Sequence, residues 1–288
     1  MPTIVDILRD HAADYGARFD SPVPEAHRKA IRDIVSCRTG DLGGRVLECP
    51  ECRTRRFVCH CCRNRACPSC HGQETVDWLV ARAGELLPVP YFHVVFTLPA
   101  SLREITRRHA DVALPLLMRT SAGALRDLAR NERFSDGEIG VLAVLHTWTR
   151  SLLWHPHAHC LVPAVAVRAN GSWHRTSPSF LVHVRALSKL FRGRFLRRLA
   201  RALPGIDLEE ASRARKWVAF CRPCGEGPQN ALAYLARYVF GGPMTGRRIL
   251  PMRKGRHGLE YTDSKTRRRR TVRLEPHELV RRFLQHTP

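Results

Sequence analysis

Several features that would assign the chain to a common protein class are missing from its sequence. No apolar run approaches the roughly 18–20 residues that a membrane-spanning helix needs. The N-terminal residues do not combine a basic stretch with an apolar one, as a secretory signal does. The Walker A phosphate-binding pattern and internal repeats are also absent. We therefore expect a cytoplasmic protein that is neither membrane-embedded nor a P-loop motor.

Acidic residues are scarce relative to basic ones. The chain has 26 Asp and Glu against 48 Lys and Arg, which gives a net charge of +22 in 288 residues. Hydrophobic residues make up 44% of the chain, which is enough for a packed core. A charge of this size attracts a polyanion. Because arginine dominates and no amphipathic lipid-binding helix is evident, nucleic acid is favoured over a membrane surface.

Cysteine is abundant and unevenly distributed. Eight of the 11 cysteines lie between Cys37 and Cys70. Without an export signal, clustered cysteines indicate metal ligands before disulfides. Two C-x-x-C pairs separated by 14 residues predict a structural zinc site, although redox cysteines or an iron–sulfur cluster are alternatives. The predicted zinc ligands are Cys49, Cys52, Cys67 and Cys70.

The remaining cysteines allow more than one interpretation. Four of them lie near the predicted zinc ligands and either bind a second ion or are small buried residues. These four are Cys37, Cys59, Cys61 and Cys62. The isolated pair Cys221 and Cys224 is not expected to bind metal.

Hydrophobic periodicity predicts an α+β fold. We expect a small helical, zinc-stapled module followed by a central antiparallel sheet with flanking helices, divided as domains 1–88 and 89–288. The expected strands cover residues 91–98, 140–148 and 152–162, and the last two form a hairpin. The expected helices lie within residues 1–36 and over 73–88, 101–131, 185–202 and 229–240.

Histidines alternate along the third expected strand. His155, His157 and His159 point to one face of the sheet. His146 on the partner strand falls opposite His157 or His159. Neutral imidazoles at His146, His157 and His159 would form an open site for a divalent ion that polarises a phosphate oxygen. The alternative is a group of surface histidines near a tight turn.

Two tyrosines share one face of the helix expected over residues 229–240. Tyr234 and Tyr238 are four residues apart. Either they are half-buried amphipathic side chains, or they are nucleophiles that need an activated phosphorus, because a phenol has a pKa near 10. Asn230, one turn earlier, is interpreted as an ordinary polar residue rather than a metal or DNA contact.

Taken together, these motifs resemble the two-tyrosine HUH-endonuclease transposases of rolling-circle insertion sequences, which carry an N-terminal zinc-binding domain. They occur in the family's order through most of the chain. The matching stretches are Cys37-Arg-Thr with Gly43-Gly44, Cys49-Pro-Glu-Cys52, Cys62-Arg-Asn-Arg-Ala-Cys67-Pro-Ser-Cys70, Tyr91-Phe-His-Val-Val-Phe-Thr-Leu-Pro99, Leu145-His-Thr-Trp148, His155-Pro-His-Ala-His-Cys-Leu-Val-Pro163 and Tyr234-Leu-Ala-Arg-Tyr238.

The resemblance implies a transposase that cleaves and rejoins single-stranded DNA at element ends. It implies that Tyr234 and Tyr238 form 5′-phosphotyrosine links, and that His157 and His159, with His146 by analogy, hold Mg²⁺ or Mn²⁺. It also implies structural zinc and a bacterial, nucleoid-associated location. Basic residues expected to hold DNA phosphates are Arg192, Arg197, Arg198, Arg267, Arg268, Arg269 and Arg270.

The sequence departs from the family pattern in three places. Ala66 stands where relatives often have histidine, Cys221 and Cys224 are unusual, and the chain ends at Pro288, so we expect a truncated copy. Two alternatives stay open: a rolling-circle replication initiator or relaxase with the same chemistry, and an inactive remnant that only binds DNA.

Overall fold

The chain divides into two compact units, each built from separated segments. The computed structural model describes residues 2–18, 22–214, 217–224, 232, 244, 248–263 and 266–287. The first unit, here called the terminal unit, contains Met1–Val76, Trp148–Leu153 and Phe240–Pro288. The second, the sheet unit, contains Asp77–Thr147 and Trp154–Val239. This division by packing differs from the expected boundary at residue 88, because C-terminal residues share a core with the N-terminal helices.

The terminal unit joins helices from both ends of the chain. A capping box starts its first helix, in which the Thr3 side chain accepts the Asp6 amide and Asp6 accepts the Thr3 amide. Its core contains Ile4, Ile7 and Leu8 from that helix and Phe283 from the last one. Its elements are α1 (Ile4–Tyr15), η1 (Gly16–Arg18), α2 (Glu25–Val35), β1 (Gly44–Glu48), β2 (Arg55–Cys59), β9 (Ile249–Arg253), β10 (Arg256–Thr262), β11 (Arg269–Leu274) and α9 (Pro276–Leu284).

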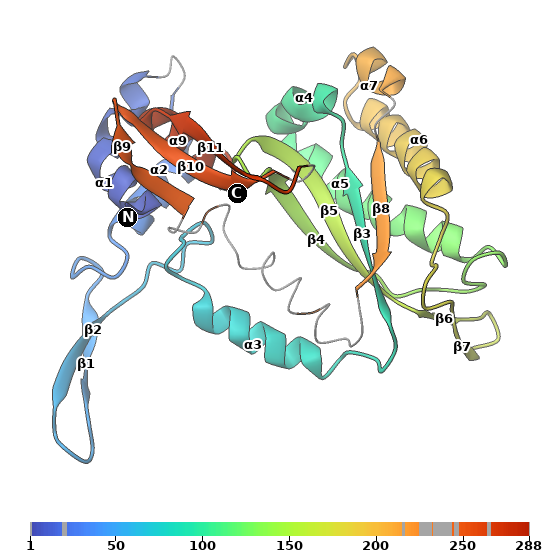
Figure 1. Ribbon diagram of the computed structural model, residues 1–288, viewed down its shortest axis with the longest axis horizontal. Coiled ribbons are helices and arrows are strands. Elements are labelled where there is room, and N and C mark those ends of the chain that lie inside the picture. The colour runs from blue at the N-terminus through green and yellow to red at the C-terminus, as the bar shows by residue number, and fades with distance from the viewer. Residues whose placement is uncertain are drawn as a thin grey trace. The chain divides into compact units, whose positions relative to one another are not determined.

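Two sheets belong to the terminal unit. Strands β1 and β2 form a two-stranded antiparallel hairpin that projects from the unit (Figure 1). Strands β9, β10 and β11 form an antiparallel sheet with β10 in the centre. The inner side of this sheet contributes Ile249, Leu259 and Leu274 to the same core as α1 and α9.

The sheet unit is built around a four-stranded sheet of order β4-β5-β3-β8. Strand β3 pairs antiparallel with both β5 and β8. The elements are α3 (Gly72–Ala83, which begins in the terminal unit), β3 (Tyr91–Thr97), η2 (Ala100–Leu102), α4 (Arg103–Arg108), α5 (Ala110–Ala129), β4 (Leu142–Trp148), β5 (Trp154–Pro163), β6 (Val165–Val167), β7 (Trp173–Arg175), α6 (Val184–Ala202), α7 (Glu209–Arg213) and β8 (Val218–Pro223).

Strand alternation gives the four-stranded sheet two different faces. Phe92, Val94 and Phe96 of β3 point to one side and are covered by α5 and α6 (Figure 1). Helix α6 presents Leu187, Phe191, Phe195 and Leu199 at four-residue spacing to this core. Full burial of each such side chain contributes roughly 1.5–3 kcal/mol. The intervening residues of β3, among them His93, therefore point to the opposite face.

The α+β prediction is confirmed, and most elements expected within the described residues are present. Strands β3, β4 and β5 and helices α3 and α6 match the predicted segments, whereas residues 101–131 divide into η2, α4 and α5. Strands β1, β2 and β8 and the β9–β11 sheet were not anticipated. The helix expected over 229–240 falls almost wholly outside the described residues. No helix in the part of the chain that the structure describes is long and apolar enough to span a membrane.

Candidate functional site

Three histidines converge on the sheet face opposite α5 and α6. In the β3–β5 ladder His157 lies opposite Thr97 and His159 opposite Val95, and His146 comes from the neighbouring strand β4. Nitrogen atoms of the three rings all lie within 4.8 Å of one another. The ring of His146 is 4.5 Å from that of His159 and 5.2 Å from that of His157, measured between centroids. The structure therefore brings the three predicted ligands together.

Hydrogen bonds orient two of the three imidazoles. Nδ1 of His157 lies 2.7 Å from the carbonyl oxygen of His155, which can only accept, so Nδ1 donates and Nε2 keeps its lone pair. Nδ1 of His159 lies 2.8 Å from Nε2 of His93. When His159 donates in this bond, its Nε2 is likewise left with a lone pair. Such outer partners fix the tautomer and ring orientation of metal-binding histidines.

Burial keeps the imidazoles of His157 and His159 neutral at neutral pH. It lowers the pKa of His157, and together with the neighbouring histidines it lowers the pKa of His159 to about 2. The pKa values of His93 and His155 fall to about 4, mainly through burial. A neutral imidazole is the form that binds a metal.

The donor set fits a divalent transition-metal ion. Imidazole nitrogen suits borderline ions, whereas Mg²⁺ prefers oxygen ligands. Of the two ions expected from the sequence, Mn²⁺ therefore matches three imidazoles better. His155 is not part of this set, although its ring lies 5.7 Å from that of His157 between centroids.

Two residues of the histidine face were not singled out from the sequence. His93 hydrogen-bonds His159, and the alternation of residues 91–98 was the only signal for its orientation. Arg222 of β8 lies opposite His93 in the ladder and places its guanidinium 4.9 Å from the centre of the Phe220 ring. This exposed arginine adds positive charge to the histidine face.

The arginines predicted to hold DNA do not share one surface. Arg192, Arg197 and Arg198 are exposed on α6, which covers the sheet face opposite the histidines. Arg198 also donates to the Thr120 hydroxyl of α5 at 3.2 Å. Residues 267–270 belong to the terminal unit, where Arg269 pairs with Glu260 at 3.3 Å and Arg270 with Asp263 at 3.8 Å.

The predicted nucleophiles Tyr234 and Tyr238 lie outside the described residues, as does Asn230. Their placement relative to the histidines stays a prediction.

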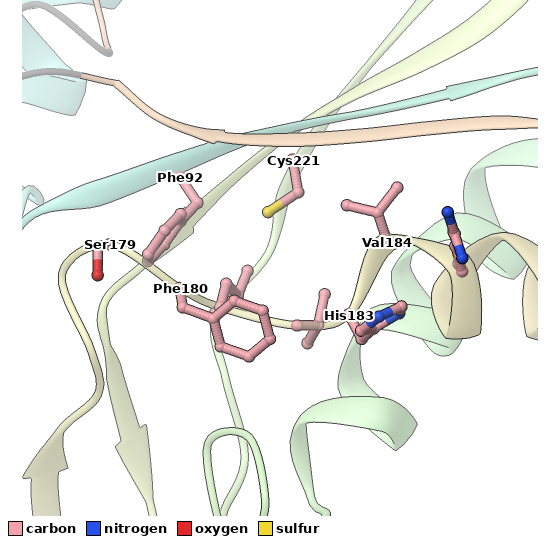
Figure 2. Close-up of a pocket in the computed structure, with 9 residues that line it drawn as sticks. Phe92, Ser179, Phe180, His183, Val184 and Cys221 are labelled. Carbon is pink, nitrogen blue, oxygen red and sulfur yellow. The ribbon is translucent and has the colours of Figure 1, made fainter.

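A pocket of about 320 Å³ on the helix-covered side of the sheet is separate from the histidine cluster. Figure 2 shows Phe92, Phe180 and Cys221 around it. Cys221 lies opposite Val94 in the ladder, so it points away from the histidine face. Burial raises the pKa of the Cys221 thiol to about 11, so this cysteine is an unreactive wall residue.

Four cysteines form a second cluster in the terminal unit. Sulfur atoms of Cys37, Cys62, Cys67 and Cys70 all lie within 4.8 Å of one another. Sγ of Cys70 is 3.5 Å from Sγ of Cys37 and 3.6 Å from Sγ of Cys62. These distances are near the roughly 3.8 Å edge of a tetrahedral zinc–thiolate site. The amide of Cys62 faces the Cys37 sulfur at 3.5 Å.

The chemistry of the cysteine cluster fits structural zinc. Burial raises the pKa of Cys62, Cys67 and Cys70 to about 12. A bound cation is needed to remove protons from such thiols at neutral pH, because metal binding and thiol ionisation are linked.

This cluster contains only half of the predicted zinc ligands. Cys67 and Cys70 belong to it, but Cys49 and Cys52 lie in the turn between β1 and β2, and Cys37 and Cys62 take their places. The ladder pairs Gly44 with Cys59 at its base and Glu48 with Arg55 at its far end. Four residue steps of strand cover about 14 Å, so the hairpin holds its turn away from the cluster. In the sequence, the stretch Cys37-Arg-Thr and the run starting at Cys62 were the signals for the two cysteines that join Cys67 and Cys70 in the cluster.

Comparison with known proteins gives two family matches. A family model described as "Putative transposase" matches residues 140–288, and one described as "Transposase zinc-binding domain" matches residues 7–98. The second match covers the four-cysteine cluster, and together they support structural zinc in this segment.

Two curated proteins resemble the chain. It is 35% identical over 305 aligned residues to "Putative transposase y4qJ" of Sinorhizobium fredii, covering 99% of this chain and 76% of that protein. It is 27% identical over 280 aligned residues to "Transposase for insertion sequence element IS801" of Pseudomonas savastanoi pv. phaseolicola, covering 90% of this chain and 66% of that protein. No solved structure matches the chain at a significant level. On the extent of these matches, the chain belongs to the IS91/IS801-type family of transposases.

Proposed function

We propose that this transposase cleaves and rejoins single-stranded DNA through 5′-phosphotyrosine intermediates, with a divalent metal ion held by His146, His157 and His159. The approach of three imidazoles on one sheet face is the observation that carries the proposal. Membership of a transposase family supports DNA as the substrate.

The chain's own residues perform a transesterification in the proposed reaction. The phenol oxygen of Tyr234 or Tyr238 attacks the phosphorus in line, and the phenol proton passes to solvent. The new bond joins tyrosine to the 5′ phosphate while the bond from phosphorus to the 3′ oxygen breaks. That oxygen takes up a proton and leaves as a free 3′-OH. The second tyrosine can then cut another strand while the first holds its product.

Residues on the histidine face would prepare the phosphate for attack. A divalent ion, when bound there, supplies Lewis-acid polarisation of a phosphate oxygen. His93 keeps the His159 ring in position through the 2.8 Å hydrogen bond. Arg222 adds a positive charge on the same face. Helix α6 covers the sheet face that does not carry the histidines. Its arginines can therefore contact only DNA that extends beyond the histidine face to the other side of the sheet unit; these are Arg192, Arg197 and Arg198.

Covalent adduct formation tests the proposal. Wild-type protein is incubated with end-labelled single-stranded oligonucleotides from an element end and Mn²⁺, and adducts are resolved on a denaturing gel. We expect adducts with the wild type and with the matched control Tyr15→Phe, but none with the double variant Tyr234→Phe/Tyr238→Phe. His157→Ala should remove most Mn²⁺-dependent adduct, whereas His155→Phe should retain it.

Full activity of the double tyrosine variant would disprove the nucleophile assignment. DNA binding without any adduct from the wild type would favour an inactive remnant instead. Cleavage without transfer of the held strand to a new 3′-OH would favour a replication initiator or relaxase.

A further inference from the structure

A strongly basic pocket lies in the terminal unit beside the tip of the β4–β5 hairpin. Its volume is about 530 Å³, and it is lined by Arg150, Arg248, Tyr261, Thr262 and Arg267. All five residues belong to the same unit. Three of them are arginines and none is acidic, so the lining carries uncompensated positive charge.

Backbone carbonyls position two of the arginines without neutralising them. Nη1 of Arg150 donates to the carbonyl oxygen of Thr262 at 2.8 Å. Nε of Arg248 donates to the carbonyl oxygen of Glu260 at 3.1 Å, and its Nη2 donates to that of Arg150. Burial and the charge of Arg150 both lower the pKa of Arg248. Two like charges are therefore held together, and an anion would stabilise them.

Nearby carboxylates are engaged elsewhere. Glu260 pairs with Arg269, and Asp263 pairs with Arg270. Within the ranges that the structure describes, none of the three pocket arginines forms an ion pair with an acidic side chain. The chain therefore leaves the pocket's charge available to a ligand.

We propose that this pocket binds a backbone phosphate of the DNA on which the transposase acts. The forked donors of arginine match the oxygens of a phosphate. Tyr261 contributes an aromatic ring on which a nucleotide can stack. Arg150 follows the metal ligand His146 by four residues, so one hairpin carries both a phosphate contact and the catalytic histidines. The inference rests on the proposed function in taking DNA as the ligand, and it adds Arg150, Arg248 and Tyr261 to the DNA contacts.

Equilibrium binding of a fluorescent single-stranded oligonucleotide tests the pocket. The measurements use the full chain carrying Tyr234→Phe and Tyr238→Phe, so that cleavage does not affect the result. We expect Arg150→Gln and Arg267→Gln each to weaken binding about tenfold, as for loss of a charge-assisted hydrogen bond. Each should also lower the slope of log K against log salt by about 0.7. Arg267→Lys should retain that slope, because the charge remains.

Arg253→Gln is the matched control. Arg253 is an exposed arginine of the same three-stranded sheet, outside this pocket. We expect its binding to stay within about twofold of the parent, as for an ordinary surface substitution. The melting temperature of each variant verifies folding, and Arg248 is left unchanged because its hydrogen bonds hold the sheet to the hairpin tip.

The proposal would be overturned if Arg150→Gln and Arg267→Gln both bound the oligonucleotide with the same affinity and the same slope of log K against log salt as the parent protein. An equal loss in Arg253→Gln would overturn it too, because net charge alone would then explain binding. Inorganic phosphate is the second ligand probe. If phosphate raises the melting temperature of the parent but not that of the arginine variants, and the variants bind the oligonucleotide as the parent does, the ligand is free phosphate and not DNA. If the wild type forms no tyrosine adducts but Arg150→Gln and Arg267→Gln still weaken oligonucleotide binding, only the proposed chemistry is rejected. If adducts form normally and these two substitutions leave binding unchanged, only the pocket proposal is rejected.

Discussion

At the scale of single residues, the histidine cluster depends on side chains that do not themselves join it. His93 stacks parallel to His159, with 6° between the ring planes, and shares a hydrogen bond with it. The His155 carbonyl fixes His157 in the same way, but through the backbone. Substitution of His93 therefore removes the hydrogen bond to His159, whereas substitution of the His155 side chain leaves the carbonyl that holds His157.

Replacing His93 with phenylalanine should weaken metal binding about 10- to 100-fold, as loss of an outer hydrogen bond to a ligand typically does. The aromatic ring keeps the packing against Phe220 while removing the nitrogen that meets His159. Titration calorimetry with Mn²⁺ measures the affinity. His155→Phe is the control and should bind Mn²⁺ nearly as the wild type does, because the His155 carbonyl remains. Equal loss in both variants would mean that packing, not the hydrogen bond, orients the ligands.

At the scale of elements, the β1–β2 hairpin separates cysteines that look alike in the sequence. Both C-x-x-C pairs have the spacing of a zinc turn, yet only Cys67 and Cys70 lie in the four-cysteine cluster. The amide of Arg38 donates to the carbonyl oxygen of His60 at 3.1 Å, which brings the segment of Cys37 beside that of Cys62. The hairpin base thus assembles the cluster, while the turn with Cys49 and Cys52 lies at its other end.

Substitution of Cys62 by serine should therefore remove one equivalent of tightly bound zinc and destabilise the terminal unit, whereas Cys49→Ser should retain that zinc. The physical reason is that three thiolates hold zinc much less tightly than a closed tetrahedral set. Zinc content by mass spectrometry of the purified proteins, together with thermal melting, makes the comparison. If Cys49→Ser loses the zinc and Cys62→Ser keeps it, the ligand set predicted from spacing is the correct one.

At the scale of the whole molecule, the two ends of the chain stabilise one another. Helix α9 packs its Leu279, Val280, Phe283 and Leu284 into the same core as α1 and the buried Cys37 and Cys67. The turn between β4 and β5 joins this core through Leu152, whose carbonyl oxygen accepts a hydrogen bond from Gln285 at 2.7 Å. The sheet unit has a core of its own around Phe96, Phe191 and Phe195.

Truncation of Phe283 to alanine should cost the terminal unit about 3–5 kcal/mol, because a fully buried aromatic ring is replaced by a cavity. Hydrogen exchange measured by mass spectrometry should show faster exchange in α1 and little change in α6. The matched variant Phe195→Ala should reverse this pattern. Faster exchange throughout the chain in both variants would show that the two units unfold as one.

Local patterns in the sequence were enough to predict the class of fold, the family, three of the four strands of the main sheet and the meeting of the three histidines. These features rest on local periodicity and on motifs such as His155-Pro-His-Ala-His159, whose alternation alone places the side chains on one face. Packing between distant segments sets which four cysteines meet, places His93 against His159, and makes the C-terminal strands and α9 part of the terminal unit. It also brought Arg150 beside Arg248 and Arg267. Such contacts join residues far apart in the chain, and they depend on hairpin length, strand order and the packing of a shared core, none of which is encoded in local spacing.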